Sequence, residues 1–235
     1  RPQYLAEQVR AVLSQTVKPL EVVLWYNKPT RRYGLFSRKQ LLSFEHSDRV
    51  KKIVCDHNFG IMPRFSLAPC LDGEYICIFD DDTIPGERWF QNCLEHIEKE
   101  NCLLGTIGLR LLSADDYPVK TEKPRMGWEA GNEQLELVDF VGHSWFFRRS
   151  WARFFWLEEP LIKTFGEDIH FCALLKKHGI RSACPPHPKS DRSLWGSLHP
   201  ERGIDRVAIS SKDRGRDYYN VVCHEISKGF KPMLL

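Results

Sequence analysis

The sequence predicts a single α/β domain, residues 1–235, in which a mostly parallel central sheet is flanked by helices. A chain of 235 residues is long enough for one such domain with a buried core. Its 42% hydrophobic and 28% charged residues are ordinary for a globular protein. Helical and strand patterns alternate along the first half, and this order indicates parallel strands with helices on both faces of the sheet.

The elements of the first half follow from the spacing of apolar residues. An apolar stripe on Leu5, Val9 and Val12 predicts an opening helix, which Lys18-Pro19 ends. Residues 35–47 fit either a short helix or a loop. The remaining predicted elements are strands at 21–26, 50–55, 74–79 and 103–112, and helices at 62–71 and 85–99.

The second half is less regular. A stretch with Gly and Pro but no periodicity predicts a long loop at 113–133. The predicted elements after it are strands at 135–141, 144–147 and 180–183, a helix or turn at 151–156, and helices at 166–178 and 214–228. A Pro-, Gly- and His-rich loop at 185–205 separates the last strand from the last helix, and its length predicts a mobile lid. The alternative is a fixed loop packed by Trp195 and Leu198.

Three aspartates, Asp80, Asp81 and Asp82, follow directly on the apolar run at 75–79. That run is typical of a buried central strand, and ligands of parallel sheets bind at the carboxyl ends of the strands. The three negative charges repel one another, and a divalent cation such as Mg²⁺ or Mn²⁺ would remove the repulsion. The alternative is a solvated acidic turn that begins the next element.

Charge and cysteine usage limit the classes of partner. A net charge of +3 is too small to indicate a nucleic-acid partner. The fragment contains no apolar stretch long enough to span a bilayer and no signal-peptide pattern. Its eight cysteines form no CxxC pair, and it contains no glycosylation sequon. These features predict reduced thiols and a cytoplasmic protein.

The order of motifs resembles the GT-A glycosyltransferases, specifically the family-two-like group. The segment RPQYLAEQVRAVLSQTVKPLEVVLWYN resembles that group's first helix and second strand, and DHNFGIMPRFSLAPCLDGEYICIFDDDTIPG resembles its helix, strand and DXD metal motif. FVGHSWFFRRS resembles the acceptor-side strand, and FGEDIHFCALLKKHG resembles the acidic-pair helix. The resemblance covers roughly residues 1–184. Because the family normally begins with a strand that precedes the first helix, that strand is expected to be absent from this fragment.

The resemblance implies a donor half at residues 1–112 and an acceptor half at residues 113–235. In the donor half, Asp82 would ligate Mn²⁺ or Mg²⁺, and Asp80 would contact the metal or the ribose. Asp81 would serve through either route, and Arg64 could contact the diphosphate. A bound metal would neutralise the charge that develops on the leaving diphosphate.

The acidic pair Glu167-Asp168 would supply the catalytic base. Inverting members of the group keep the base in this pair, and we expect Asp168 to fill the role, with Glu167 as second choice. Acidic residues in the first turn of a helix also stabilise its macrodipole without any catalysis. Both interpretations are compatible with the sequence.

Three histidines, His143, His187 and His199, compete for a further metal-ligand role. Some GT-A enzymes take such a histidine from a late loop, so His199 in WGSLHP is the expected ligand. Trp128 and Trp145 fit either a sugar platform or the core.

The expected activity is inverting, metal-dependent transfer of a sugar from a nucleotide-diphosphate donor to a hydroxyl acceptor on a glycan or related molecule. A uridine nucleotide is the preferred donor, the sugar is a hexose or deoxyhexose, and the fragment could be one module of a larger protein. The alternative is a non-catalytic glycan- or nucleotide-binding domain on the same scaffold. A haloacid-dehalogenase phosphatase is disfavoured because Ile84 stands where its DxDxT motif requires threonine.

Overall fold

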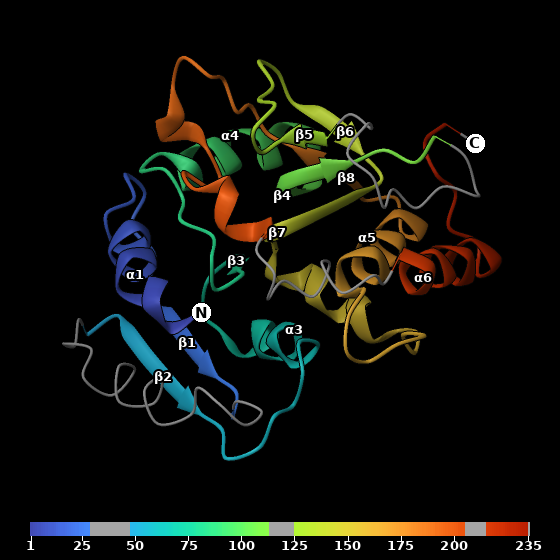
Figure 1. Ribbon diagram of the computed structural model, residues 1–235, viewed down its shortest axis with the longest axis horizontal. Coiled ribbons are helices and arrows are strands. Elements are labelled where there is room, and N and C mark those ends of the chain that lie inside the picture. The colour runs from blue at the N-terminus through green and yellow to red at the C-terminus, as the bar shows by residue number, and fades with distance from the viewer. Residues whose placement is uncertain (29–47, 113–124, 205–214, 235) are drawn as a thin grey trace.

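The computed structural model describes residues 1–28, 48–112, 125–204 and 215–234 (Figure 1). Within these residues the chain forms a six-stranded sheet, a separate two-stranded sheet, and helices around both. The predicted α/β class and single domain are confirmed. The predictions made for residues 35–47, for 113–124 of the long loop and for 205–214 fall outside the described residues.

The smaller sheet pairs β1 (Val22–Tyr26) in parallel with β2 (Val50–Val54). The larger sheet has the order β3-β7-β4-β8-β6, with β5 beside β4. Its strands are β3 (Tyr75–Phe79), β4 (Cys102–Leu109), β5 (Arg125–Gly127), β6 (Glu136–Val138), β7 (Phe140–Arg148) and β8 (Arg181–Cys184). The helices are η1 (Pro2–Tyr4), α1 (Leu5–Leu13), α3 (Pro63–Leu67), η2 (Ala68–Cys70), α4 (Trp89–Glu100), η3 (Arg149–Trp156), α5 (Glu167–Lys177), η4 (Arg192–Leu194), η5 (Pro200–Ile204) and α6 (Gly215–Ser227).

The large sheet is mixed rather than mostly parallel. The strands β3, β4 and β8 run in the same direction, as the alternation of helices and strands predicts. The strand β6 pairs antiparallel with β8. In the sequence, β7 follows β6 after a single residue. β7 therefore enters between β3 and β4 in the opposite direction, which the alternating pattern of the first half does not predict.

Side chains that alternate along β7 build the core on both faces of the sheet. Phe146 faces α4, where its ring centroid lies 6.3 Å from that of Phe90. The flanking residues point to the other face. There Phe147 lies 5.1 Å from Phe171 of α5, and Phe65 of α3 packs beside both. This aromatic cluster fixes α3 and α5 against the strand that carries His143.

Two predicted helices are shorter than expected for identifiable reasons. The helix predicted at 62–71 divides into α3 and η2 near Pro69, which has no N–H to continue the hydrogen-bond ladder. The helix predicted from residue 85 begins at Trp89 instead. Gly86 donates to the carbonyl of Trp195, and Arg88 donates to that of Ser193, so residues 86–88 are held by the later loop.

Candidate active site

The three aspartates lie at the carboxyl end of β3, in a turn that two other elements hold. From α1, the side-chain amide of Gln8 donates to the carbonyl oxygens of Asp80 at 2.6 Å and Thr83 at 2.8 Å. From β7, the carbonyl oxygen of His143 accepts from the backbone N–H of Asp80 at 3.0 Å. Asp82 is buried, whereas Asp81 is exposed. The turn is therefore fixed before any ligand binds.

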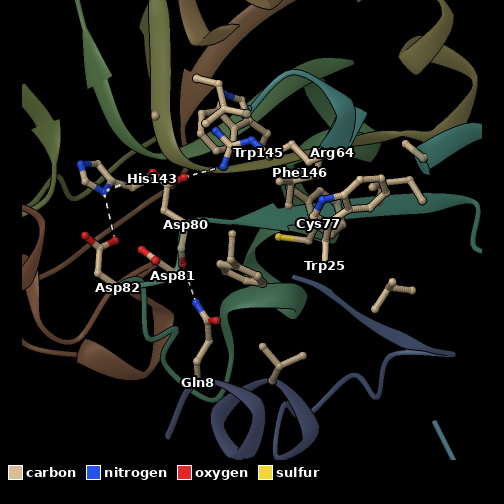
Figure 2. A pocket seen from close by; sticks show the side chains of 18 of the residues that line it. Gln8, Trp25, Arg64, Cys77, Asp80, Asp81, Asp82, His143, Trp145 and Phe146 are labelled. Atoms are coloured by element: carbon tan, nitrogen blue, oxygen red, sulfur yellow. Dashed lines mark hydrogen bonds and ion pairs between the residues drawn. The ribbon is translucent and has the colours of Figure 1, made fainter. Parts of the chain in front are cut away.

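Asp80, Asp82 and His143 each offer a ligand atom, and these atoms lie within 4.8 Å of one another. Nδ1 of His143 is 3.7 Å from Oδ2 of Asp80 and 3.8 Å from Oδ1 of Asp82 (Figure 2). That Nδ1 is buried and has no hydrogen-bond partner among the described residues. Burial lowers the pKa of His143, which favours the neutral imidazole that metals bind. The donor set fits a divalent cation.

The backbone and neighbours of His143 are unusual. Its φ of +63° lies in the left-handed region, next to the register shift between β4 and β7. The ring of Trp128 packs on its imidazole, with centroids 4.2 Å apart. A Cβ added to Gly203 would come within 2.7 Å of Cε1 of His143. The imidazole is thus enclosed by two segments far apart in sequence.

A cationic side chain already lies against the aspartates. The guanidinium of Arg1 pairs with the buried carboxylate of Asp82. The carboxylates at this position therefore accept positive charge in the geometry that the structure shows.

Arg64 connects the aspartates to the acidic pair of α5. One guanidinium nitrogen donates to Oδ1 of Asp80 at 2.6 Å, and the other pairs with Oε1 of Glu167. The guanidinium lies 4.4 Å from the ring of Trp145, which supports it from one face (Figure 2). Oδ1 of Asp80 is thus engaged by Arg64, while Oδ2 faces His143. Arg64 ties the first and second halves of the chain together at this point.

Glu167 and Asp168 begin α5 after Gly166, whose φ is +78°. Burial raises the pKa of both carboxyl groups, and the nearby Arg64 opposes the rise. Asp168 accepts from the N–H of Ile169 with Oδ1, while its Oδ2 lies beside Gly142. The carboxylate of Glu167 is paired with Arg64. Asp168 is therefore the member of the pair whose carboxylate keeps an oxygen, Oδ2, away from Arg64.

A cavity of about 1360 Å³ contains both groups. It is lined by Asp80, Asp82, His143, Glu167 and Asp168, and also by Trp128. The sequence predicted the aspartates, Arg64 and the acidic pair as functional residues, and the structure brings them to this cavity.

The other two histidines lie elsewhere. Nε2 of His199 is 3.3 Å from Glu7, and its Nδ1 is 3.1 Å from Glu201. His199 is therefore not in the group that His143 completes. His187 is fully buried and bonds to the carbonyl of Pro185 and the N–H of Gly196, so its role is structural. The positive φ and enclosed position of His143 depend on the fold, and no local pattern in the sequence indicates them.

The part of the predicted lid that the structure describes is anchored up to Leu198. The N–H of Leu198 donates to the carbonyl of Ile84 at 2.7 Å, and the buried indole of Trp195 donates to that of Pro188 at 2.7 Å. Beyond it, Arg202 pairs with Glu7 of α1 at 2.6 Å. The mobility of this loop stays a prediction.

Comparison with protein families places these residues in a known context. The family model described as glycosyl transferase family 2 matches residues 1–155. The chain belongs to glycosyltransferase family 2. The match includes the aspartate turn, Arg64 and His143, and it confirms the predicted GT-A resemblance and the glycosyltransferase class. Family 2 membership implies a nucleotide-sugar donor and an acceptor.

Comparison with curated proteins found no match to this chain. Among the residues described, no helix is both long and apolar enough to cross a membrane. The eight cysteines are free thiols.

Proposed function

We propose that the protein is a metal-dependent, inverting glycosyltransferase that moves a hexosyl or deoxyhexosyl group from a UDP-sugar to a hydroxyl acceptor on a glycan or related molecule. One observation carries the proposal. The Asp80, Asp82 and His143 group opens into the same cavity as the acidic pair Glu167-Asp168. A cation-binding group and a candidate base in one cavity are what transfer from a nucleotide diphosphate requires.

The donor set favours Mn²⁺ over Mg²⁺. Two carboxylates suit either ion, but an imidazole ligand is disfavoured for Mg²⁺, which prefers oxygen ligands. Asp80 and Asp82 would hold the metal with His143. His199, the ligand expected from sequence, would have to leave Glu7 and Glu201 to reach it. When bound, the metal would stabilise the negative charge of the diphosphate leaving group.

Asp168 is the proposed base. Its carboxylate would take the proton from the acceptor hydroxyl as that oxygen forms a bond to the anomeric carbon. The bond from that carbon to the diphosphate oxygen breaks, and the nucleoside diphosphate leaves. Burial raises the pKa of Asp168 above its ordinary value, which brings a carboxylate closer to the range useful for a general base. Glu167 would instead keep Arg64 in place, because Arg64 occupies Oε1 of Glu167.

Arg64, Asp80 and Asp81 would contact the donor, as the resemblance implies, and the half from residue 113 onward would bind the acceptor. The presence of eight free cysteines supports the proposal of a reducing, cytoplasmic setting.

A panel of nucleotide sugars tests this function. Thermal stability is measured for each donor with and without Mn²⁺, since a ligand that binds only the folded state raises stability according to its concentration over its Kd. A UDP-sugar should raise Tm only when Mn²⁺ is present, and Asp82→Ala should abolish that increase. Unchanged binding in the presence of a chelator would contradict the metal requirement.

Turnover separates the enzyme from the second candidate, a non-catalytic glycan- or nucleotide-binding domain. The enzyme should release the nucleoside diphosphate from the stabilising donor when acceptor glycans are supplied. Tight donor binding with neither transfer nor hydrolysis would favour the binding domain.

A further inference from the structure

The ring of His170, about one turn into α5, lies between two hydrogen-bond acceptors. Its Nδ1 is 2.7 Å from Oε1 of Glu225 in α6, and its Nε2 is 3.2 Å from the carbonyl oxygen of Phe155 in η3. The side chains of His170 and Glu225 are each 1% exposed. A carbonyl and an ionised carboxylate only accept hydrogen bonds, so each ring nitrogen that faces one must carry a proton. This geometry is that of an imidazolium.

His187 shows the contrasting arrangement. It is also fully buried, but its Nδ1 faces the carbonyl of Pro185 while its Nε2 accepts from the N–H of Gly196. One nitrogen donates and the other accepts, which is the pattern of a neutral imidazole. Burial lowers the pKa of His187 to about 4, in agreement with that pattern. The two histidines therefore differ in their partners and not in their burial.

Charged groups around His170 come from each element packed against it. Lys177 of α5 lies 3.4 Å from Oε2 of Glu225 and 3.0 Å from Oε1 of Glu158, which follows η3. Lys228, just after α6, lies 3.7 Å from Oε2 of Glu158. Burial raises the pKa of Glu225, but the hydrogen bonds and charges of His170 and Lys177 outweigh burial and lower this pKa overall. Glu225 is therefore the ionised partner that an imidazolium requires.

The same helix, α6, also holds the residues that precede the acidic pair. Figure 1 shows α6 beside α5. The ring of Tyr218 meets that of Phe165 edge to face, with centroids 5.1 Å apart. A Cβ added to Gly166 would lie 3.3 Å from Cγ1 of Val221, so α6 packs directly on the backbone at that point. Both contacts lie on the face of α6 that carries Glu225, which makes α6 a support along the start of α5.

We propose that His170 is a positioning residue, whose imidazolium clamps α5 to Glu225 of α6 and to the carbonyl of Phe155 in η3 and so fixes the direction of the Asp168 carboxylate. The inference rests on the proposed function, in which Asp168 is the base. The donor side is supported differently, because α1 and β7 hold the aspartate turn. Loss of this clamp should therefore impair proton abstraction and leave donor binding intact.

The clamp depends on pH in one direction. Because the pKa of Glu225 is lowered, its carboxylate stays ionised at neutral and mildly acidic pH, where the clamp is complete. As pH rises and His170 releases a proton, one of the two acceptors loses its hydrogen bond and Glu225 loses the opposite charge. Turnover should therefore have an alkaline limb, in addition to the acid limb that Asp168 sets.

NMR of the protein labelled with ¹⁵N-histidine tests the imidazolium without an activity measurement. At pH 7 both ring nitrogens of His170 should carry a proton, whereas His187 should show one protonated and one bare nitrogen. A bare nitrogen in His170 at pH 7 would overturn the inference, because the ring would then be neutral.

Glu225→Gln tests the positioning role, since it keeps the shape of the side chain and removes its charge. At pH 7 kcat should fall by about tenfold or more, because small displacements of a catalytic group have large effects on rate, while KM for the donor stays within about twofold. In the parent protein kcat should fall over the pH range in which NMR shows His170 losing its proton, and the variant should lack this limb. His178→Gln, at the other end of α5, is the matched control and should behave like the parent.

The carboxyl group of Asp168, followed by ¹³C NMR, separates this inference from the proposed function. Burial raises the pKa of Asp168, so release of α5 in Glu225→Gln should move that pKa back towards the ordinary aspartate value. Such a shift, in a protein that transfers from no donor, would refute the proposed function and support the clamp. Transfer by the parent, with kcat and the Asp168 titration unchanged in a folded variant, would overturn the clamp alone. If the variant does not fold, a parent without an alkaline limb at the titration of His170 has the same meaning.

Discussion

At the scale of single residues, His143 does two things with one position. Its carbonyl oxygen holds the backbone of Asp80, and its imidazole faces the carboxylates of Asp80 and Asp82. Because the carbonyl contact does not depend on the side chain, the proposed metal-ligand role can be removed separately from the structural one.

His143→Ala should weaken Mn²⁺ binding by about tenfold or more, since even groups outside the ligand set change metal affinity by that much. Titration calorimetry with Mn²⁺ alone measures the change. His199→Ala is the matched control, and it should leave the affinity unchanged. Loss of affinity in the His199 variant, with none in the His143 variant, would return the ligand role to His199.

Asp168→Asn keeps the shape of the side chain and removes the proton acceptor. We expect turnover to fall by about 10²-fold or more, in the range that general-base catalysis supplies, with donor affinity little changed. The same variant should melt at a higher temperature than the parent at pH 7.5. Burial raises the pKa of Asp168, so its ionised form destabilises the folded state at that pH. A collapse of donor affinity would place Asp168 on the donor side, and Glu167→Gln would then be tested as the base.

The raised pKa of Asp168 also predicts a pH profile. The base acts only when ionised, so kcat/KM should fall as pH decreases through this raised pKa, well above the ordinary aspartate value of about 3.9. Rates measured from pH 4.5 to 8.5 locate the acid limb. A rate that stays flat down to pH 4.5 would exclude a buried carboxylate as the base.

At the scale of elements, the sequence predicts secondary structure most accurately where local residues alone determine the conformation. The apolar run at 75–79 forms β3, and Gly179 follows the helix α5 as predicted. The start of α4 is missed because residues 193–195 hold Gly86 and Arg88, and no local signal in the sequence shows that contact. The position of β7 between β3 and β4 is missed for the same reason. Long-range partners decide both.

The late loop divides into an anchored part and a part held mainly by side chains. Residues up to Leu198 make backbone hydrogen bonds to the segment before α4, whereas Arg202 and His199 contact Glu7 through side chains alone. We expect opening to be confined to residues after Leu198. Trypsin should cut after Arg202, and donor with Mn²⁺ should slow that cut markedly. Cleavage after Arg192 at the same rate, or no effect of the ligands, would contradict a lid.

At the scale of the whole molecule, the α/β class and the GT-A resemblance could be predicted because the order of elements and the motifs can be read directly from the sequence. The candidate site could be predicted in part. Asp80, Asp82 and the acidic pair belong to recognisable motifs. The position of His143 beside the aspartates depends instead on a left-handed backbone and on contacts with Trp128 and Gly203. Contacts of that kind exist only after the chain has folded.

The last described helix, α6, is joined to α5 by a buried cluster of polar and charged side chains. Oε1 of Glu225 in α6 lies 2.7 Å from Nδ1 of His170, and its Oε2 lies 3.4 Å from Lys177, both on α5. Glu225→Ala should reduce the free energy of unfolding by about 3–5 kcal/mol, because it leaves buried partners uncompensated. Urea denaturation measures the loss. Glu159→Ala, which removes an exposed partner of Lys163, should leave the midpoint unchanged; equal effects of the two variants would mean that the cluster adds no stability.

Two bulky residues that touch each other at the site, Trp128 and His143, both have left-handed backbones, with φ of +55° and +63°. Such conformations are unfavourable by roughly 1–3 kcal/mol for each residue. Glycine and asparagine adopt them with less strain. Laboratory selection for heat resistance alone should therefore repeatedly enrich Gly or Asn at positions 128 and 143. The variants it returns would be more stable proteins that have lost the imidazole and the indole, so screens for thermostability of this enzyme need a simultaneous selection for transfer.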